Sequence, residues 1–248
     1  MRPLEGIEWG REEGFSWLMT PGRKDGTNCI YEVNLAPERA EAGIDGIIAR
    51  FREKGLYPAW WIGPSARPRD LDRLLRAREF RVLETDTGMA LELDRRLPGA
   101  ALREGLRLIR IEDPRRLLEV LEIFGPGVGL SPLEYRQEHA ALVNLGLGPG
   151  QPFQHFAGLL GEELVSSTSF FRMGETAVLD YVSSSPAHRG KGFAKAVFAA
   201  ALKEARERGC RRAVLLATEM GRPFYRSLGF QELCAVSIWS YRPASQVD

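Results

Sequence analysis

The stretch from residue 186 to 194 carries the strongest chemical signal in the chain. It reads Pro-Ala-His-Arg-Gly-Lys-Gly-Phe-Ala and joins a strand-like segment, 177–182, to a helical one that begins near Gly192. Glycines at such a junction let backbone N–H groups turn toward one point, and a helix start adds unpaired donors and the positive end of its dipole. Arg189 and Lys191 add positive charge beside it. The loop therefore predicts a ligand that carries phosphate.

Two common phosphate-binding loops do not fit this stretch. A Walker loop needs Ser or Thr after its Gly-Lys pair, whereas Lys191 is followed by Gly192. The dinucleotide fingerprint needs three glycines in the order Gly-x-Gly-x-x-Gly, and the loop has only Gly190 and Gly192. The pattern that remains is Arg-x-x-Gly-x-Ala, from Arg189 to Ala194.

The segments after the loop can be predicted from their periodicity. Apolar residues at three- and four-residue spacing predict a helix that ends at Gly209, and the apolar run 212–217 predicts a buried strand. A second helix should follow Gly221, and 232–241 reads as a closing strand. The second helix carries Phe-Tyr-Arg-Ser-Leu-Gly-Phe at 224–230, which contains the pattern Tyr-x-x-x-Gly-Phe.

The Arg-x-x-Gly-x-Ala loop and the Tyr-x-x-x-Gly-Phe ending together resemble the two signatures of the GNAT superfamily of N-acyltransferases. The resemblance extends over roughly residues 105–241 and is specific between 179 and 230. It implies an α/β fold with a mixed, mostly antiparallel twisted sheet, helices on both faces and a V-shaped opening between two central strands. It also implies acetyl-CoA as cosubstrate.

The resemblance assigns cofactor binding to the end of the first strand and to the loop. The backbone of Val182, Ser183 and Ser184 would pair with the pantetheine arm, and the Ser184 N–H would polarise the acyl oxygen without reorganising as charge develops. His188 is expected to be a solvated loop residue. The pyrophosphate would lie on the loop residues Arg189, Gly190, Lys191, Gly192, Phe193 and Ala194.

Two residues are candidates for the proton transfers. The position of Tyr225 in its motif matches the family tyrosine that protonates the departing thiolate, although a buried tyrosine could also serve packing alone. Asp180 precedes the loop on its strand and could accept the proton of the amine, or could be a salt-bridged structural residue. Some family members have a glutamate earlier on this strand, where the chain has Thr176. Glu219 is a weaker candidate for the base.

The first half predicts a second folded unit that echoes the later one. Strand-like segments near 27–34, 58–62 and 88–93 alternate with helical segments at 40–54 and 70–78, followed by a linker at 97–99. We therefore expect residues 1–98 to form a degenerate, truncated GNAT-like unit and residues 105–246 to form the catalytic domain.

The first unit should bind no CoA. Where the second half has its glycine loop, the first has Glu38 and Glu41, and Leu75 stands where the second has Tyr225. Carboxylates would repel a pyrophosphate, and leucine cannot donate a proton. Two roles fit such a unit: shaping the acceptor cleft, or stability alone.

Composition limits the class of protein. The 248 residues carry a net charge of +1 with both signs interspersed, which does not predict a nucleic-acid or membrane partner. The N-terminal region is rich in Glu and has no apolar core, so it does not read as a signal peptide. The three cysteines form neither a metal pattern nor a disulfide framework, which favours the cytoplasm and predicts no bound metal.

The function predicted from these features is transfer of an acetyl group from acetyl-CoA to a primary amine of a small molecule or peptide. Direct attack in a ternary complex is favoured, since no candidate covalent nucleophile lies where the thioester should be. A non-catalytic acyl-CoA-binding or regulatory protein, and a purely structural pseudo-repeat protein, are the alternatives. Neither the acceptor nor the oligomeric state can be deduced from the sequence.

Overall fold

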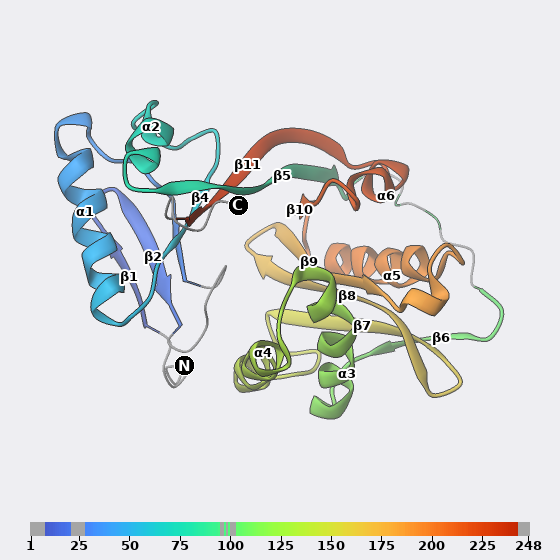
Figure 1. Ribbon diagram of the computed structural model, residues 1–248. Coiled ribbons are helices and arrows are strands. Elements are labelled where there is room, and N and C mark those ends of the chain that lie inside the picture. Colours follow the sequence, from blue (N-terminus) through green and yellow to red (C-terminus); the bar gives the residue numbers. More distant parts are fainter. Residues whose placement is uncertain (1–7, 21–27, 95–96, 98, 100–102, 243–248) are drawn as a thin grey trace. The chain divides into compact units, whose positions relative to one another are not determined.

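The computed structural model describes residues 8–20, 28–94, 97, 99 and 103–242, and these form eleven strands and six α-helices (Figure 1). The strands are β1 (Glu8–Glu12), β2 (Phe15–Met19), β3 (Cys29–Tyr31), β4 (Ala59–Ile62), β5 (Phe80–Glu92), β6 (Leu106–Arg110), β7 (Phe153–Leu160), β8 (Glu163–Met173), β9 (Thr176–Ser184), β10 (Arg212–Ala217) and β11 (Gln231–Tyr241). The helices are α1 (Pro37–Glu53), α2 (Leu71–Arg76), α3 (Pro114–Phe124), α4 (Pro132–Leu145), α5 (Phe193–Glu207) and α6 (Arg222–Ser227), with short 3-10 turns η1 (Gly125–Val128) and η2 (Pro186–His188).

The chain divides into two compact units, and three strands, β5, β10 and β11, contribute residues to both. The first unit contains the chain up to Gly88, Leu216–Met220 and β11 from Leu233 onward; the second contains Met89–Leu215 and Gly221–Glu232. The division drawn from the sequence placed β11 wholly in the later domain. Its proposed limits at residues 98 and 246 lie outside the described residues.

The sheet of the second unit has helices on both faces. Its strand order is β10-β9-β8-β7-β6, with antiparallel neighbours except for the parallel pair β9 and β10. Helix α5 covers one face, whereas α3 and α4 lie on the other (Figure 1). A Cβ at Gly158 of β7 would lie 2.9 Å from Val197 of α5, while the neighbouring Ala157 belongs to the core under α3. The predicted mixed, mostly antiparallel α/β fold is therefore confirmed.

Helix α5 forms where the apolar periodicity predicts it. The apolar positions turn inward, and Gly209, with φ +84°, ends the helix in a conformation that glycine adopts without strain. The side chains buried along this face are Phe193, Ala196, Val197, Phe198, Ala201, Leu202 and Ala205.

Helices α3 and α4 begin with side-chain caps. The Asp113 side chain accepts a hydrogen bond from the Arg115 N–H, and Ser131 and Glu134 form a capping box at the start of α4. α3 packs against both α4 and β9. Their shared core brings the helix pair close to the strand that leads into the glycine loop. It includes Leu117, Val120, Leu121, Leu142, Phe153 and Tyr181.

The first unit repeats part of this architecture. The order β3-α1-β4-α2-β5 matches β9-α5-β10-α6-β11, and β3 and β4 are parallel as β9 and β10 are. The predicted internal repeat is thus confirmed. Helix α1 starts at Pro37 without glycine or a side-chain cap, and Glu38 lies in its first turn. The inability of this unit to bind CoA stays a prediction.

Several elements escaped prediction. β1, β2 and β6 to β8 were not singled out, and β5 begins at Phe80 rather than near residue 88. The exposed run from Val82 to Thr85 explains the error in β5, because it lacks the alternation that marks a half-buried strand.

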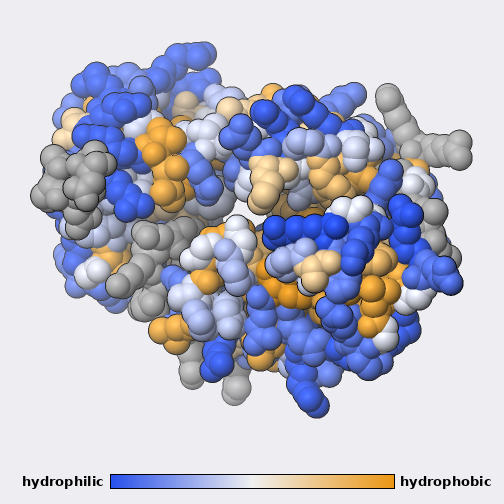
Figure 2. All heavy atoms as spheres, turned by 45° about the vertical axis from the view of Figure 1, so that its right-hand side comes forward, coloured by the Kyte–Doolittle hydropathy of each residue, from blue (hydrophilic) through white to orange (hydrophobic). Residues whose placement is uncertain are grey.

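The surface mixes side chains of different polarity. On the face drawn in Figure 2, hydrophilic side chains are interspersed with apolar ones. None of the described helices is both long and apolar enough to cross a membrane.

Candidate functional site

The loop between β9 and α5 has the backbone geometry that its glycines suggest. Gly190 and Gly192 have φ of +76° and +82°, the left-handed region that side chains disfavour. Gly192 is the N-cap residue of α5, and no side chain caps the helix. The first backbone N–H groups of a 15-residue helix therefore point into this loop without a side-chain acceptor.

Three cationic side chains surround this helix start, and sequence reasoning missed one of them. Arg189 and Lys191 are exposed loop residues, and their contact with a pyrophosphate stays a prediction. The third is Arg103, whose guanidinium lies over Gly192, since a Cβ at that glycine would lie 2.6 Å from the Arg103 Nη2. No sequence signal marks Arg103, because it lies far upstream and outside both motifs.

His188 differs from its prediction. Its side chain is 14 % exposed and its Nδ1 lies 3.5 Å from a carboxylate oxygen of Glu163. Its ring lies 6.0 Å from that of Phe193. The expectation of a solvated residue was wrong, because the 3-10 turn at 186–188 folds the imidazole against the helix start.

The strand that leads into the loop separates from its neighbour. β9 and β10 pair only from Thr176 to Val178, although β9 continues to Ser184. The described residues thus show the opening between two central strands that was predicted. Val182, Ser183 and Ser184 are half-buried beside it, and their contacts with a pantetheine arm stay a prediction.

A β-bulge lies in the same part of β9. Ser167 faces Ser183 and Ser169 faces Asp180, so β9 has one more residue than β8 between these pairs. The Ser166 hydroxyl donates to the Ser183 carbonyl at 2.7 Å, and the Ser167 hydroxyl lies 2.7 Å from that of Ser183. Serine side chains of β8 therefore support the irregular strand.

Tyr225 lies in an aromatic cluster at the end of α6. It is 9 % exposed, and its ring centroid lies 5.7 Å from Phe198 and 6.1 Å from Phe230. No hydrogen bond of its hydroxyl to another described residue is found. Burial, and then the negative charge of Asp180, raise the pKa of Tyr225. The phenol is therefore protonated and able to act as a donor.

Asp180 is accessible to water and still desolvated by the protein atoms around it. Desolvation raises the pKa of this carboxyl to about 6; the negative charge of Glu138 acts in the same direction, and the Tyr181 N–H opposes both. No cation forms an ion pair with Asp180 among the described residues. The salt bridge that a structural role for Asp180 would involve is thus not found in the described part of the chain, and the role of Asp180 as the base stays a prediction.

The two predicted catalytic residues lie in the same unit, and the Asp180 charge raises the pKa of the Tyr225 phenol. Glu138 of α4 accepts a hydrogen bond from the Tyr181 hydroxyl and acts on Asp180 through its charge, and it was not predicted from the sequence. Its position on a helix 42 residues before Asp180 gave no pattern that could have linked the two.

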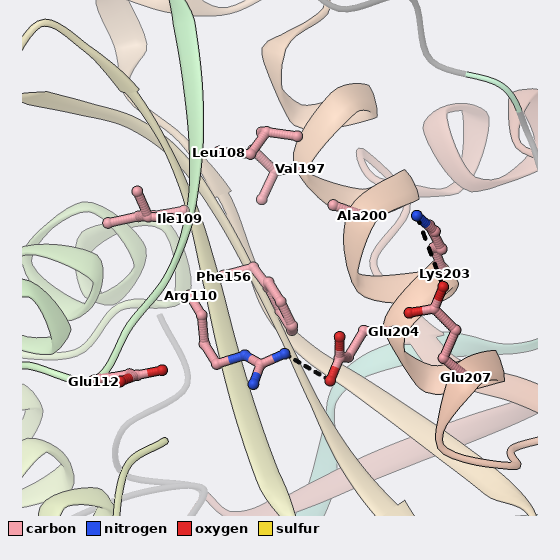
Figure 3. A pocket seen from close by; sticks show the side chains of 11 residues that line it. Leu108, Ile109, Arg110, Glu112, Phe156, Val197, Ala200, Lys203, Glu204 and Glu207 are labelled. Atoms are coloured by element: carbon pink, nitrogen blue, oxygen red, sulfur yellow. Dashed lines mark ion pairs between the residues drawn. The ribbon is translucent and has the colours of Figure 1, made fainter. Parts of the chain in front are cut away.

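A cavity of about 350 Å³ lies elsewhere, between α5 and the strands β6 and β7. In Figure 3 Arg110 points toward Glu204, and Lys203 toward Glu207. None of the predicted site residues lines this cavity. We assign the candidate site to the loop and the strand opening because the uncapped helix start and the Asp180–Tyr225 pair lie there.

The described residues contain no cluster of side chains that could form a metal-binding site. Among the described residues there is no group of three or more His, Cys, Asp or Glu arranged to hold an ion.

The comparisons with known proteins bear on this architecture. The model of the acetyltransferase (GNAT) family matches residues 119–230. A GCN5-related N-acetyltransferase from Kribbella flavida is similar to the chain with a TM-score of 0.77 and 12 % identity, over 97 % of this chain and 91 % of that one. No curated protein matches the chain.

Two further solved structures are also similar. One is a GCN5-related N-acetyltransferase from Sphaerobacter thermophilus, with a TM-score of 0.64, 16 % identity and coverage of 93 % and 81 %. The other is a tandem GNAT protein from the clavulanic acid biosynthesis pathway, with a TM-score of 0.64, 17 % identity and coverage of 93 % and 79 %. At such identities the likeness shows the fold alone. Residues 119–230 form a domain of the acetyltransferase (GNAT) family.

Proposed function

We propose that the protein transfers an acetyl group from acetyl-CoA to a primary amine, by direct attack of the amine in a ternary complex. The observation that carries the proposal is the uncapped start of α5 with its two left-handed glycines, in the same unit as the Asp180–Tyr225 pair. The first feature suits a pyrophosphate and the second suits a reaction that moves two protons.

The cofactor would be held mainly by the backbone. N–H groups at the start of α5 would donate to the pyrophosphate oxygens, and Arg189 and Lys191 would neutralise its charge. Val182 and Ser183 would pair with the pantetheine arm along the free edge of β9. The Ser184 N–H would donate to the acyl oxygen, where negative charge develops as the amine attacks.

The two titratable side chains would divide the proton transfers. Asp180 would accept a proton from the acceptor ammonium, and a carboxyl with a pKa of about 6 is ionised at neutral pH. The neutral amine would form the new C–N bond as the C–S bond breaks, and Tyr225 would give its proton to the departing thiolate. The proton that the nitrogen loses as the amide forms would return to the Tyr225 phenolate. The products are an amide and free CoA.

A covalent acyl-enzyme fits the site less well. The Ser183 hydroxyl lies 2.7 Å from the hydroxyl of Ser167, which is no general base. Attack by the amine itself needs no such nucleophile, and this favours the ternary complex.

The proposal is tested by incubating the protein with acetyl-CoA and a set of primary amines and following the release of free thiol. We expect at least one amine to be acetylated, with mass spectrometry showing the amide. Calorimetry with acetyl-CoA is the parallel measurement. Binding without turnover, across small amines, peptides and cell extracts, would instead favour a non-catalytic acyl-CoA-binding protein.

The raised pKa of Asp180 predicts the acidic limb of the pH profile. Its carboxylate form is the active one and its pKa is about 6, so kcat should fall about tenfold per pH unit below pH 6 rather than below about pH 4. The measurement is kcat under saturating substrates from pH 4.5 to 8. In Asp180→Asn the limb near pH 6 should vanish and the remaining rate should be lower; a limb that persists there would assign the base elsewhere.

A further inference from the structure

Tyr181 occupies the bulge of β9 in an unusual backbone conformation. Its φ is +49°, in the left-handed region that bulky aromatic residues rarely adopt. Such conformations persist where the surroundings determine them fully, and they cluster at functional sites. The contacts of Tyr181 therefore indicate which function this bulge in β9 serves.

Contacts from three directions hold Tyr181 in place. The Ser167 hydroxyl donates to its carbonyl oxygen at 2.8 Å. Its ring centroid lies 5.0 Å from that of Phe124 and 5.8 Å from that of Phe153. Its hydroxyl donates to the Glu138 carboxylate of α4. The side chain thus joins the bulged strand to a helix that covers the sheet.

The same residue fixes its neighbour in the sequence. The Tyr181 N–H donates to Asp180 Oδ1 at 2.7 Å, so the conformation at Tyr181 sets the direction of the Asp180 carboxylate. Glu138, which accepts the hydrogen bond from the Tyr181 hydroxyl, also acts on Asp180 through its charge. The backbone N–H of Tyr181 therefore acts on Asp180 directly, and its hydroxyl acts on Asp180 through Glu138.

We infer that Tyr181 and Glu138 are a positioning pair, whose hydrogen bond fixes the β9 bulge against α4 and holds the Asp180 carboxylate toward the acceptor amine. The inference deepens the proposed function and rests on it, because the direction of Asp180 affects turnover only if this carboxylate takes the proton of the amine.

Two other titratable side chains, Tyr225 and His155, lie near the Tyr181–Glu138 hydrogen bond, and both are uncharged at neutral pH. The Tyr225 phenol of α6 is protonated, because burial and then the negative charge of Asp180 raise its pKa. His155 of β7 lies 6.3 Å, ring to ring, from Tyr181 and donates to or accepts from the Ser169 hydroxyl through Nδ1. Burial lowers the pKa of His155 to about 4, so it is neutral at pH 7. Glu138 is thus the acidic side chain that the pair places near Asp180.

Two substitutions separate the bond from the charge. Tyr181→Phe keeps the ring and removes the hydroxyl, so the hydrogen bond is lost. Glu138→Gln supplies an amide oxygen that can still accept a hydrogen bond from the Tyr181 hydroxyl, while the negative charge is lost. The readouts are the melting temperature, kcat and KM for each substrate, acetyl-CoA affinity by calorimetry, and the titration of the Asp180 carboxyl carbon by NMR, assigned through Asp180→Asn.

A positioning role predicts different results for the two variants. Tyr181→Phe should lower kcat about tenfold, the effect of losing one hydrogen bond to a charged group, with acetyl-CoA affinity unchanged. Glu138→Gln should keep most of kcat and move the Asp180 titration to lower pH, because a negative neighbour has been removed.

Two results would overturn the inference. One is a Tyr181→Phe protein with wild-type kcat and only a lower melting temperature, which is what packing alone predicts. The other is a Glu138→Gln protein whose Asp180 midpoint stays in place. If the Tyr181→Phe protein does not fold, the Asp180 titration midpoint in Glu138→Gln decides whether the inference holds. If wild type turns over no amine, the proposed function fails, and the Asp180 titration in Glu138→Gln still decides whether the pair acts on that carboxylate.

Discussion

Replacing Gly190 with valine should reduce the affinity for acetyl-CoA by at least about tenfold. A Cβ at this position meets no protein atom within 4 Å, but φ is +76°, so a β-branched residue would force the loop out of its present conformation. The backbone N–H groups of the loop would then no longer point at one pyrophosphate. Calorimetry with acetyl-CoA and with CoA measures the loss directly.

The chain offers a matched control in Gly174→Val. Gly174 lies in the turn between β8 and β9, has φ +57°, and likewise has no atom within 4 Å of a Cβ position. Both variants should lose a similar stability, about 1–2 kcal/mol for a left-handed non-glycine residue. Only the Gly190 variant should lose the cofactor. Equal acetyl-CoA affinities in the Gly190→Val and Gly174→Val variants would show that the loop between β9 and α5 does not bind the cofactor.

Tyr225→Phe should lower kcat by about 100-fold and leave acetyl-CoA affinity close to wild type. The ring contacts with Phe198 and Phe230 survive the change, whereas the proton for the departing thiolate is gone, and general acids contribute factors of this size. The measurement is thiol release under saturating substrates, together with calorimetry. Tyr57→Phe, which removes a hydroxyl in the first unit, is the control and should keep kcat.

A leaving group that needs no proton separates acid catalysis from packing. If Tyr225 protonates the thiolate, acyl donors with a thiol of lower pKa should lose less rate in Tyr225→Phe than acetyl-CoA does. An equal loss for both donors would mean that the hydroxyl supports the fold of the site and not the departure of the thiolate.

The cofactor loop was predictable because its physics is local. Two glycines, two cations and a helix start lie within a few residues, and their spacing alone specifies left-handed turns before an uncapped helix. The position of Tyr225 followed from the same kind of short pattern. The internal repeat was predictable for a related reason, since its order of strands and helices can be read segment by segment.

The acceptor side was not predictable, because it depends on contacts between distant parts of the chain. Glu138 reaches Tyr181 from 43 residues away, and Arg103 lies over Gly192 from further still. The bulge in β9 was also hidden, since nothing in the alternation near Tyr181 marks an extra residue. β8 was hard to predict because the buried serines at 166, 167 and 169 interrupt its apolar pattern, and in β7 the buried Gln154 and His155 do the same.

The sharing of β11 has a consequence for how the protein must be made. Ser237, Ile238 and Trp239 pair with β4, and Trp239 belongs to the core of the first unit together with Trp60 and Phe80. During synthesis this unit starts first, yet it lacks one strand and part of its core until residue 241 has left the ribosome. Until then β4 has an unpaired edge, which is the kind of surface on which chaperones act and on which aggregation begins. The unit that is begun first is therefore completed only after the catalytic one has been synthesised.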